Sequence, residues 1–591
     1  MEYALDRFAG EIQHAIVATG LVPPDQIDLA EPKANVPADL AFPCFRAAKQ
    51  AGTAPPQLAQ QLAAALRFDE NSLIGSVQAA GPFLNFTLNP PQLVRAVLDE
   101  VARLGERYGS DDQGQNQTVI VEYSSPNIAK RMHVGHIRST IIGQSIRNIL
   151  DFLGYHTLSD NHLGDYGKQF GTNIAAIQRF GRPEGEGEEV LSKIEEIYTR
   201  YNRLMGSKID EDEDNPDAEN LDDEARSWSL KLEQNDPTAR ELWEWMVTTT
   251  KRANQPNYDR LGVHFDMQHG ESFYADMLPS VIGRVEQSGL GHREPGGALI
   301  VKELRDKNGK ELPLFLVQRS DGATLYLTRD IATIIYRERE YHPAKLIYVV
   351  GQPQELHFRQ VFALARALGH AQEIELVHIY FGTVFSAEGQ PLSTRRGNMI
   401  YLESLLNEAK ARARALIEQK IAEGKTELTP EEIDSVAEAV GVGAVIYNDL
   451  YQDPKRNITI DWDRMISFEG NSAPYLQYTH ARCCSILREA GELPAEFDPH
   501  SLLTEEELAV IKQIARFPGV VRRAGAAYAP YSIAEWLYAT AREFARFYRD
   551  HRVLNAPTPE IRAARLHLVA ATAQALRNGL RLLAIQAPER M

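Results

Sequence analysis

The chain has 591 residues, too many for one ordinary hydrophobic core, so we expect three or four domains. Its composition, 43% hydrophobic and 24% charged, is that of a globular protein, and no apolar run approaches the ~18–20 residues that a membrane span needs. The sparse cysteines, Cys44, Cys483 and Cys484, and an N-terminus without a basic-then-apolar layout predict a reducing compartment, so we expect a cytoplasmic protein in which these thiols pack inside.

The formal net charge of −18, taken alone, argues against a partner as acidic as nucleic acid. Much of the negative excess, however, lies in the acidic run Ile209–Glu224, which is typical of a solvated surface insertion. The segment from Thr540 to Met591 instead holds nine arginines, no lysine and four acidic residues. The acidic chain can therefore still carry a positive surface.

Residues 1–115 are predicted to form a small α+β add-on domain. LAQQLAAALRF has the spacing of a helix, and GPFLNFTLNP alternates as a strand does. If Leu84 and Phe86 face inward, Phe83 and Asn85 face outward. An outward phenylalanine beside an asparagine can stack on a nucleobase, although the pattern predicts an ordinary exposed aromatic equally well. The polar segment RYGSDDQGQNQ that follows is predicted to be a linker.

Residues 116–400 have the pattern of a Rossmann-like parallel sheet. The buried-type strand TVIVEYSS is followed by a loop, by the apparently amphipathic helix HIRSTIIGQSIRNILDFLG ending at Gly154, and by a second strand in YHTLSDNHLGDYG. We expect further strands in ALIVKEL, ATLYLT, KLIYVVG and ELVHIYFGTVF. A polar, mostly helical insertion covers about 175–300.

The remainder is predicted to be helical. Residues 401–465 form a helical connector, and 466–591 form an all-α domain in which RAARLHLVAATAQALRNGLRLLAI has apolar residues at helical spacing. The predicted fold class is therefore α/β, with a helical insertion, an α+β N-terminal domain and an all-α C-terminal domain.

The loop SSPNIAKRMHVGHIRST carries the most informative chemistry. It leaves the carboxyl end of the first strand and enters a helix, where open α/β sheets bind ligands and where free N–H groups attract phosphate. His133 and His136 are three residues apart and can donate to phosphate oxygens, Gly135 lets a flat ring approach the backbone, and Lys130 adds a positive charge. These groups predict a nucleotide site that works mainly by electrostatics.

The sequence offers two other possible sites for a metal or a phosphate group. A pair of histidines can share zinc, but the segment lacks a clear third ligand, so we predict no protein-bound metal. A phosphate-binding P-loop is not predicted, because the only G-K-T, in IAEGKTEL, has Gln419 in place of the first glycine.

The loop resembles the HIGH signature of class I aminoacyl-tRNA synthetases, and its longer form VEYSSPNIAKRMHVGHIRSTIIG resembles the arginyl-tRNA synthetase family. Five further segments resemble that family in the same order: NHLGDYGKQFGTN, SDGATLYLTRDIA, IYVVGQPQELHFRQVF, SFEGNSAPYLQYTHARCCSI and RNGLRLLAIQAPERM. GPFLNFTL is similar to its N-terminal domain.

The resemblance implies an arginine pocket. The residues that it points to are Glu122, Ser125, Asn127, Tyr326, Asp330 and Gln354. Their chemistry agrees, because a guanidinium needs planar, paired acceptors and an anionic partner. Tyr326 and Asp330 are four apart, so they share a face if the chain turns into a helix there.

The resemblance also exposes a departure. A second loop of the K-M-S-K type matches FSAEGQPLSTRRGNMI, which contains no lysine. Many members of the family share this feature and carry a lysine just ahead of the HIGH signature, where Lys130 lies. We therefore expect Lys130 to supply phosphate charge, assisted by Arg395 or Arg396, with Ser393 also near ATP. From the residues alone, Lys130 is equally an ordinary loop lysine.

The tail resembles the family's anticodon-binding domain. The residues on matching positions are Tyr475, Tyr478, Arg482, Tyr548 and Met591. Aromatic residues there would stack on anticodon bases, while Phe83 and Asn85 would contact the tRNA elbow. Without the family, two tyrosines three apart would be read as ordinary helix packing.

The resemblance implies a monomeric enzyme that ligates arginine to tRNA(Arg), using ATP with Mg²⁺ and forming arginyl-adenylate, without a membrane partner. Two rivals remain: a nucleotidyltransferase acting on a small alcohol or acid, which leaves the helical tail unexplained, and a non-catalytic RNA-binding relative, which should have lost His133 or His136.

Overall fold

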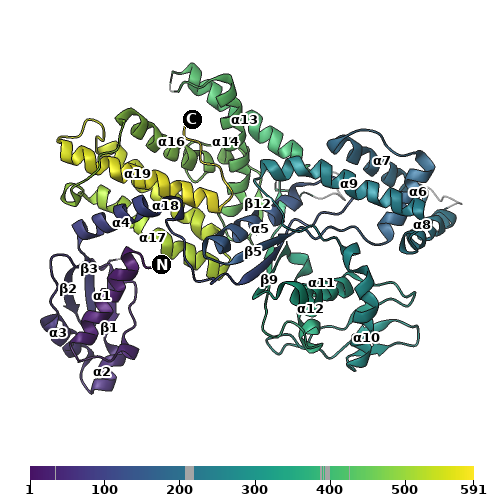
Figure 1. Cartoon of the computed structure of the whole chain (residues 1–591), viewed down its shortest axis with the longest axis horizontal. Coiled ribbons are helices and arrows are strands. Elements are labelled where there is room, and N and C mark those ends of the chain that lie inside the picture. Colours follow the sequence, from purple (N-terminus) through teal and green to yellow (C-terminus); the bar gives the residue numbers. More distant parts are fainter. Residues whose placement is uncertain (34, 207–217, 387–388, 391, 393–398, 425) are drawn as a thin grey trace.

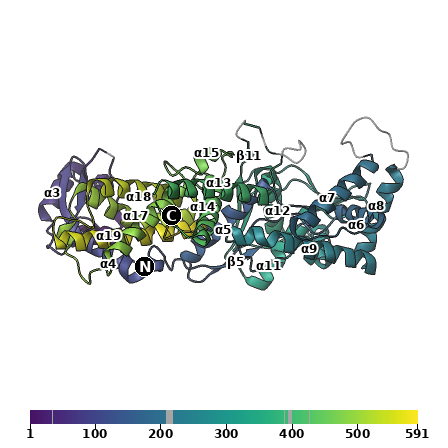
Figure 2. The same ribbon diagram turned by 90° about the horizontal axis from the view of Figure 1, so that it is seen from above.

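The computed structural model describes residues 1–591 except 34, 207–217, 387–388, 391, 393–398 and 425. The molecule is elongated: the N-terminal domain and the helical tail lie at one end, the polar insertion lies at the other, and a parallel sheet lies between them (Figure 1). The view from above shows the same order (Figure 2). Within the described part of the chain, no helix has the length and apolar character needed to cross a bilayer.

The N-terminal domain is an antiparallel sheet covered by helices. The strands β1 (Leu40–Pro43), β3 (Phe83–Leu88) and β2 (Ile74–Ala80) lie in that order, and the helices are α1 (Ala4–Ala18), α2 (Phe45–Ala51), α3 (Pro55–Ala65) and α4 (Pro90–Leu104). Leu84 and Phe86 are buried and Phe83 is exposed, as the alternation in β3 predicts.

The polar segment that follows is not a free linker. Tyr108 is fully buried, and its hydroxyl donates to the carbonyl of Ile514 at 2.9 Å in α17 (Glu505–Ala527). One buried aromatic residue thus attaches a segment of polar composition to the tail, a contact that composition cannot reveal.

The central sheet has four parallel strands in the order β10 (Glu375–Phe381), β9 (Lys345–Gly351), β4 (Thr118–Glu122) and β5 (His156–Asp160). The two inner strands, β9 and β4, are buried along most of their length. This explains why they are almost continuously apolar rather than alternating. The predicted parallel sheet is confirmed.

Two of the expected strands were placed wrongly. The ALIVKEL segment contributes β7 (Leu299–Val301) to a separate antiparallel sheet with β6 (Gly291–Arg293) and β8 (Phe315–Gln318). In ATLYLT, Tyr326 begins the helix α11 (Tyr326–Tyr341). Short apolar runs fit either structure, and here the tertiary fold decided between them.

The helix after the signature loop, α5 (Val134–Phe152), is buried on most of its surface rather than amphipathic. Even Arg138 has no exposed surface, because it donates to Asp449 of α14 (Pro430–Leu450) at 2.9 Å and to carbonyl groups of the chain after it. The sheet covers one side of α5, and the connector and the tail cover the others. Gly154 follows the helix with φ = +82°, as expected of a helix end.

The remaining elements are mostly helical. The insertion holds α6 (Lys168–Phe180), α7 (Gly187–Leu204), α8 (Ala218–Glu233), α9 (Pro237–Arg260) and α10 (Leu278–Gln287), and α12 (Glu355–Ala367) joins β9 to β10. The connector and tail hold α13 (Leu402–Ala422), α14, α15 (Trp462–Met465), α16 (Ala473–Ala490), α17, α18 (Tyr531–Asp550) and α19 (Pro559–Leu582). A short parallel pair, β11 (Val384–Phe385) and β12 (Ile458–Thr459), links the two parts. Residues 218–224 of the acidic run belong to α8, where Leu221 is buried, and the rest of that run before residue 218, from 209 to 217, lies outside the described residues.

Candidate active site

The loop after β4 adopts a strained conformation. Ser124, Ser125 and Ala129 have φ angles of 72°, 47° and 64°, in the left-handed region that residues other than glycine seldom adopt. Neighbouring segments hold the loop in place: Ser139 Oγ accepts the N–H of Ser124 at 2.9 Å, and the N–H of Ile128 donates to the Gly164 carbonyl at 3.1 Å. The strain is thus maintained beside the carboxyl end of the sheet.

The two signature histidines form the N-terminal cap of α5. The Nδ1 of His133 accepts the N–H of Gly135 at 3.1 Å, and the Nδ1 of His136 accepts the N–H of His133 at 3.1 Å. Burial lowers the pKa of His133 to about 4 and that of His136 to about 3, and the charge of Lys130 acts in the same direction. Since each Nδ1 accepts a hydrogen bond, each neutral ring carries its proton on Nε2, which has no hydrogen-bond partner among the described residues and can donate to a ligand.

The packing of the histidine rings, as well as ligand access, requires glycine at position 135. A Cβ at this position would lie 2.9 Å from Cε1 of His133, closer than a side chain can normally approach. The glycine therefore makes room for the first histidine ring, whose centre lies 4.0 Å from that of the second.

A cavity of about 610 Å³ opens at the carboxyl ends of β4 and β9. It is lined by His136 and Gly135 of the signature and by all six residues expected to hold arginine: Glu122, Ser125, Asn127, Tyr326, Asp330 and Gln354. The hydroxyl of Ser125 is buried and has no hydrogen-bond partner among the described residues. Such an unsatisfied group is available to a ligand.

Basic side chains of the protein meet the acidic residues of this cavity. Arg337 is almost fully buried and pairs with Glu122 at 2.7 Å and with Asp160 at 2.8 Å. The Nε2 of His357 lies 2.5 Å from Asp330. These contacts fix the carboxylate groups in position before any substrate binds.

Glu271 is a cavity residue that the sequence did not single out. It lies in a short 3₁₀ helix (Glu271–Met277) and pairs with Arg329 at 2.6 Å. The guanidinium of Arg329 in turn lies 5.0 Å from the ring centre of Tyr326. Burial raises the pKa of Glu271 to about 7. Nothing local in GESFY signals this role, since the fold alone brings Glu271 to the residues around Asp330.

The residues predicted to bind the ATP phosphates are not all found in the wall of this cavity. The ammonium of Lys130 lies 5.8 Å from the ring centre of Tyr198 in α7 and is not part of the cavity wall. Ser393, Arg395 and Arg396 lie outside the described residues. The chain leaving that second loop is joined to the signature, because the N–H of Val134 donates to the Ile400 carbonyl at 2.9 Å.

A second cavity, of about 560 Å³, lies in the helical tail and gathers four of the residues expected to contact tRNA: Tyr478, Arg482, Tyr548 and Met591. The Arg482 guanidinium lies 4.6 Å from the ring centre of Tyr478 and 5.0 Å from that of Tyr548. Tyr475 is not part of this wall, and its hydroxyl donates to the Ala541 carbonyl instead.

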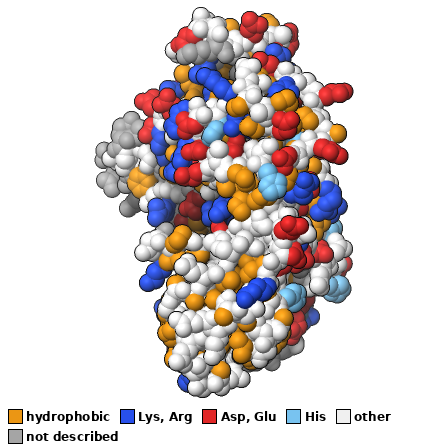
Figure 3. Space-filling model, turned by 90° about the vertical axis from the view of Figure 1, so that its left-hand side faces the viewer, with side chains coloured by type: hydrophobic (Ala, Val, Ile, Leu, Met, Phe, Trp, Pro, Cys, Tyr) orange, Lys and Arg blue, Asp and Glu red, His pale blue; other side chains and the backbone are white. Residues whose placement is uncertain are grey.

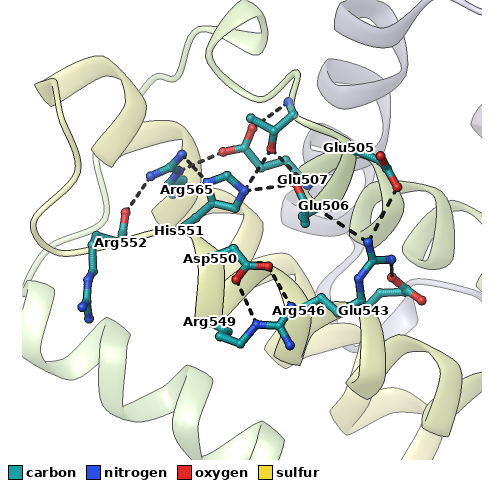
Figure 4. Close-up of polar contacts among 11 residues, drawn as sticks. Glu505, Glu506, Glu507, Glu543, Arg546, Arg549, Asp550, His551, Arg552 and Arg565 are labelled. Carbon is teal, nitrogen blue, oxygen red and sulfur yellow. Dashed lines mark hydrogen bonds and ion pairs between the residues drawn. The ribbon is translucent and has the colours of Figure 1, made fainter.

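A buried ion pair holds the rim of the tail cavity (Figure 4). Arg565 donates to Glu507 at 2.8 Å and to the carbonyl of Arg552 at 2.7 Å, which fixes the turn after α18. Arg552 and His551 of this turn line the cavity. In the N-terminal domain, Phe83 is exposed beside Phe45, with ring centres 5.6 Å apart, and Asn85 is half-buried.

Comparison with known proteins agrees with this geometry. Residues 99–462 match the model of the catalytic domain of class I tRNA synthetases (R), and a curated arginine–tRNA ligase of Chloroflexus aurantiacus is 58% identical over the full length of both chains. The chain belongs to the arginyl-tRNA synthetase family. Residues 6–88 match the family's N-terminal domain, and 476–591 match the DALR anticodon binding domain.

Other members of the arginyl-tRNA synthetase family are similar to this chain, in sequence or in structure, over most of its length. A curated arginine–tRNA ligase of Halothermothrix orenii is 39% identical over 94% of both chains. The solved arginyl-tRNA synthetase of Thermus thermophilus superposes with a TM-score of 0.80 at 27% identity, covering 99% of this chain and all of that one. The α/β fold with an N-terminal domain and a helical tail is therefore that of the family.

Proposed function

We propose that the protein ligates L-arginine to tRNA(Arg) in two ATP-dependent steps. The observation that carries the proposal is that one cavity brings His136 of the signature together with three carboxylate groups, those of Glu122, Asp330 and Glu271. A donor group for phosphate thus lies beside acceptors for a cation.

In the first step, a carboxylate oxygen of arginine attacks the α-phosphorus of ATP. A new P–O bond forms, the bond to the bridging oxygen breaks, and pyrophosphate leaves. The neutral Nε2–H groups of His133 and His136 can donate to the phosphate oxygens as negative charge grows there. A ribose hydroxyl of tRNA then attacks the carbonyl carbon of arginyl-adenylate and loses its proton, the bond from that carbon to the phosphate oxygen breaks, and AMP leaves.

Discrimination against lysine follows from the geometry of the cavity. Tyr326, Asp330 and Glu271 lie on one side of it, attached to α11 and to the 3₁₀ helix that contacts α11. A guanidinium can satisfy several of these fixed acceptors at once, whereas an ammonium group leaves some of them unpaired and buried.

Magnesium would enter with ATP. Within the described ranges, no cluster of three or more His, Cys, Asp or Glu residues is arranged to hold a metal ion. The proposal therefore leaves Mg²⁺ to the phosphate groups and water. We propose that the protein acts as a monomer, in the cytoplasm with the rest of translation.

The decisive experiment is a charging assay with ATP, radiolabelled arginine and total tRNA. We expect acid-precipitable arginine, and none when lysine replaces it. Charging of another amino acid, or nucleotide transfer to a small alcohol without tRNA, would contradict the proposal. A variant on the exposed loop ahead of α11, Asp321→Asn, should charge tRNA with arginine as the wild type does.

Lys130 is proposed to supply positive charge to the triphosphate in place of the lysine missing from the second loop. In support of this role, the charge of Lys130 acts to lower the pKa of both signature histidines, alongside their burial. We expect Lys130→Ala to slow ATP–pyrophosphate exchange, measured with tRNA present, by about 100-fold. Lys193→Ala in α7, whose ammonium pairs with Glu189 on the helix surface, is the matched control. A near-normal rate for Lys130→Ala would exclude this role.

A further inference from the structure

A cavity of about 650 Å³ separates the N-terminal domain from the helical tail. One wall comes from α1, from residues 31–33, 36 and 38–40, and from the end of β3 at Leu88, and the other comes from α17. Neither the resemblance of the chain nor the proposed reaction assigns a role to this cleft.

Ion pairs fix the two walls relative to each other. Lys512 of α17 pairs with Asp39 at 2.6 Å, and Arg522 pairs with Asp6 at 2.6 Å and with Asp111 at 3.1 Å. The acidic groups of the N-terminal wall are therefore largely neutralised by α17, and the cleft is held open by contacts at both ends of the helix segment that lines it.

Positive charge remains unpaired inside the cleft. Three exposed basic side chains line the cleft and have no ion-pair partner among the described residues: Arg516 and Arg523 of α17 and Lys33 of the opposite wall. Among the described carboxylate groups that line the cleft, only that of Glu31 also lacks an ion-pair partner. Arg516 and Arg523 are seven residues apart, so they project from the same face of α17 about 10 Å apart along its axis.

We propose that this cleft binds the phosphodiester backbone of the tRNA. The argument rests on the proposed function, which supplies an RNA partner, and on charge complementarity: the cleft is positive on a chain whose net charge is −18. A guanidinium group matches two phosphate oxygens at once. In Figure 3, Lys and Arg side chains stand among Asp and Glu side chains over the upper half of this end of the molecule, while the lower half, the N-terminal domain, carries few charged side chains over most of the face shown.

The cleft also lies in a suitable place along the chain. Leu88, which lines it, ends the same strand β3 that begins at Phe83, the residue expected to contact the tRNA elbow. The other wall, α17, packs against α18, whose last turn carries Tyr548 of the tail cavity. Backbone contacts in the cleft would therefore connect the two predicted tRNA contacts.

The test is the double variant R516Q/R523Q. Neither side chain makes an ion pair with a described residue, so the fold should tolerate the change. At about 0.1 M salt we expect the affinity for tRNA(Arg) to fall by about tenfold, and the slope of log affinity against log salt to become shallower by about 1.4–1.8. The KM for tRNA should rise while kcat at saturating tRNA stays unchanged. The control R305Q/R339Q removes the same charge from two exposed arginines elsewhere.

A second binding experiment, with a fragment of the tRNA, tests which part of the tRNA the cleft contacts. Binding of the isolated anticodon stem–loop should be the same in wild type and R516Q/R523Q, because that fragment lacks the backbone proposed for the cleft. An unchanged affinity and salt slope for whole tRNA, or an equal loss with the control pair, would overturn the inference while leaving arginine charging intact. Absence of tRNA charging by the wild type would instead overturn the proposed function.

Discussion

Each carboxylate in the substrate cavity is already held by a basic side chain of the protein. Glu122 meets Arg337, Asp330 meets His357, and Glu271 meets Arg329. With Asp160, four carboxylates face two guanidinium groups and one imidazole. The cavity therefore keeps negative charge for a cationic substrate, while its acceptors are oriented in advance, which lowers the cost of binding.

Replacing Asp330 tests this arrangement directly. Asp330→Asn removes the negative charge but keeps the shape, so we expect the KM for arginine to rise by about 100-fold with little change in the KM for ATP. Steady-state exchange of pyrophosphate in the presence of tRNA measures both values. An equal rise in the KM for ATP would show that the residue serves the fold rather than arginine.

Glu271 should make arginine binding depend on pH near neutrality. Burial raises the pKa of Glu271 to about 7, so below that pH this carboxyl group is protonated in most molecules. A cationic ligand must then displace the proton in order to bind. Arginine affinity should therefore rise with pH up to about 7 and fall below it by up to about tenfold per unit. Calorimetry in buffers of different ionisation enthalpy should detect proton release on binding, and Glu271→Gln should abolish it. A flat affinity between about pH 6 and 8 in the wild type would contradict this assignment.

At the scale of elements, α5 joins the catalytic sheet to the rest of the molecule. Its first residues present the signature histidines, and one turn later Arg138 is buried against Asp449 of the connector. The position of the histidines therefore depends on a contact between segments more than 300 residues apart. Helix α11 works similarly, since its start places Tyr326 and Asp330 on one side of the cavity.

Breaking the contact of Arg138 should be costly. Arg138→Met leaves Asp449 buried without a partner, so we expect a loss of about 3–5 kcal/mol in the free energy of unfolding, visible as a lower thermal midpoint. The double variant Arg138→Met with Asp449→Leu removes both charges and should recover much of that loss. A double variant as unstable as the single one would show that the contribution is packing rather than charge.

On the scale of the whole molecule, the tail cavity and the substrate cavity belong to one chain but to different domains. Tyr478 lines the tail cavity and Tyr475 does not, although the sequence places both on the same helix. We expect Tyr478→Ala to raise the KM for tRNA by about 5–150-fold, the range for loss of one stacked base, with unchanged arginine affinity. Tyr475→Ala is the control, and charging kinetics with a range of tRNA concentrations separate KM from kcat. Equal effects of the two substitutions would argue against stacking in this cavity.

The sequence determined the class of fold and the order of the parts, and its resemblance to the family pointed to six residues of the substrate-cavity wall. The fold class depends on local patterns: apolar strands buried on both faces and a histidine-glycine loop entering a helix. The pattern in β3 likewise predicted which side chains face outward. The domain boundaries and the roles of individual site residues remain predictions.

Only the tertiary structure decided which distant side chains meet. Glu271 and His357 join the cavity, and Arg337 pairs with Glu122 of its wall, through contacts between residues far apart in sequence, and the strand-like ATLYLT became the start of a helix. The burial of α5 on most of its surface, the exclusion of Tyr475 and the positive cleft beside α17 likewise have no local signal. Residue type and spacing specify what a side chain can do, but burial and pairing energies arise only when the folded chain brings its partners together.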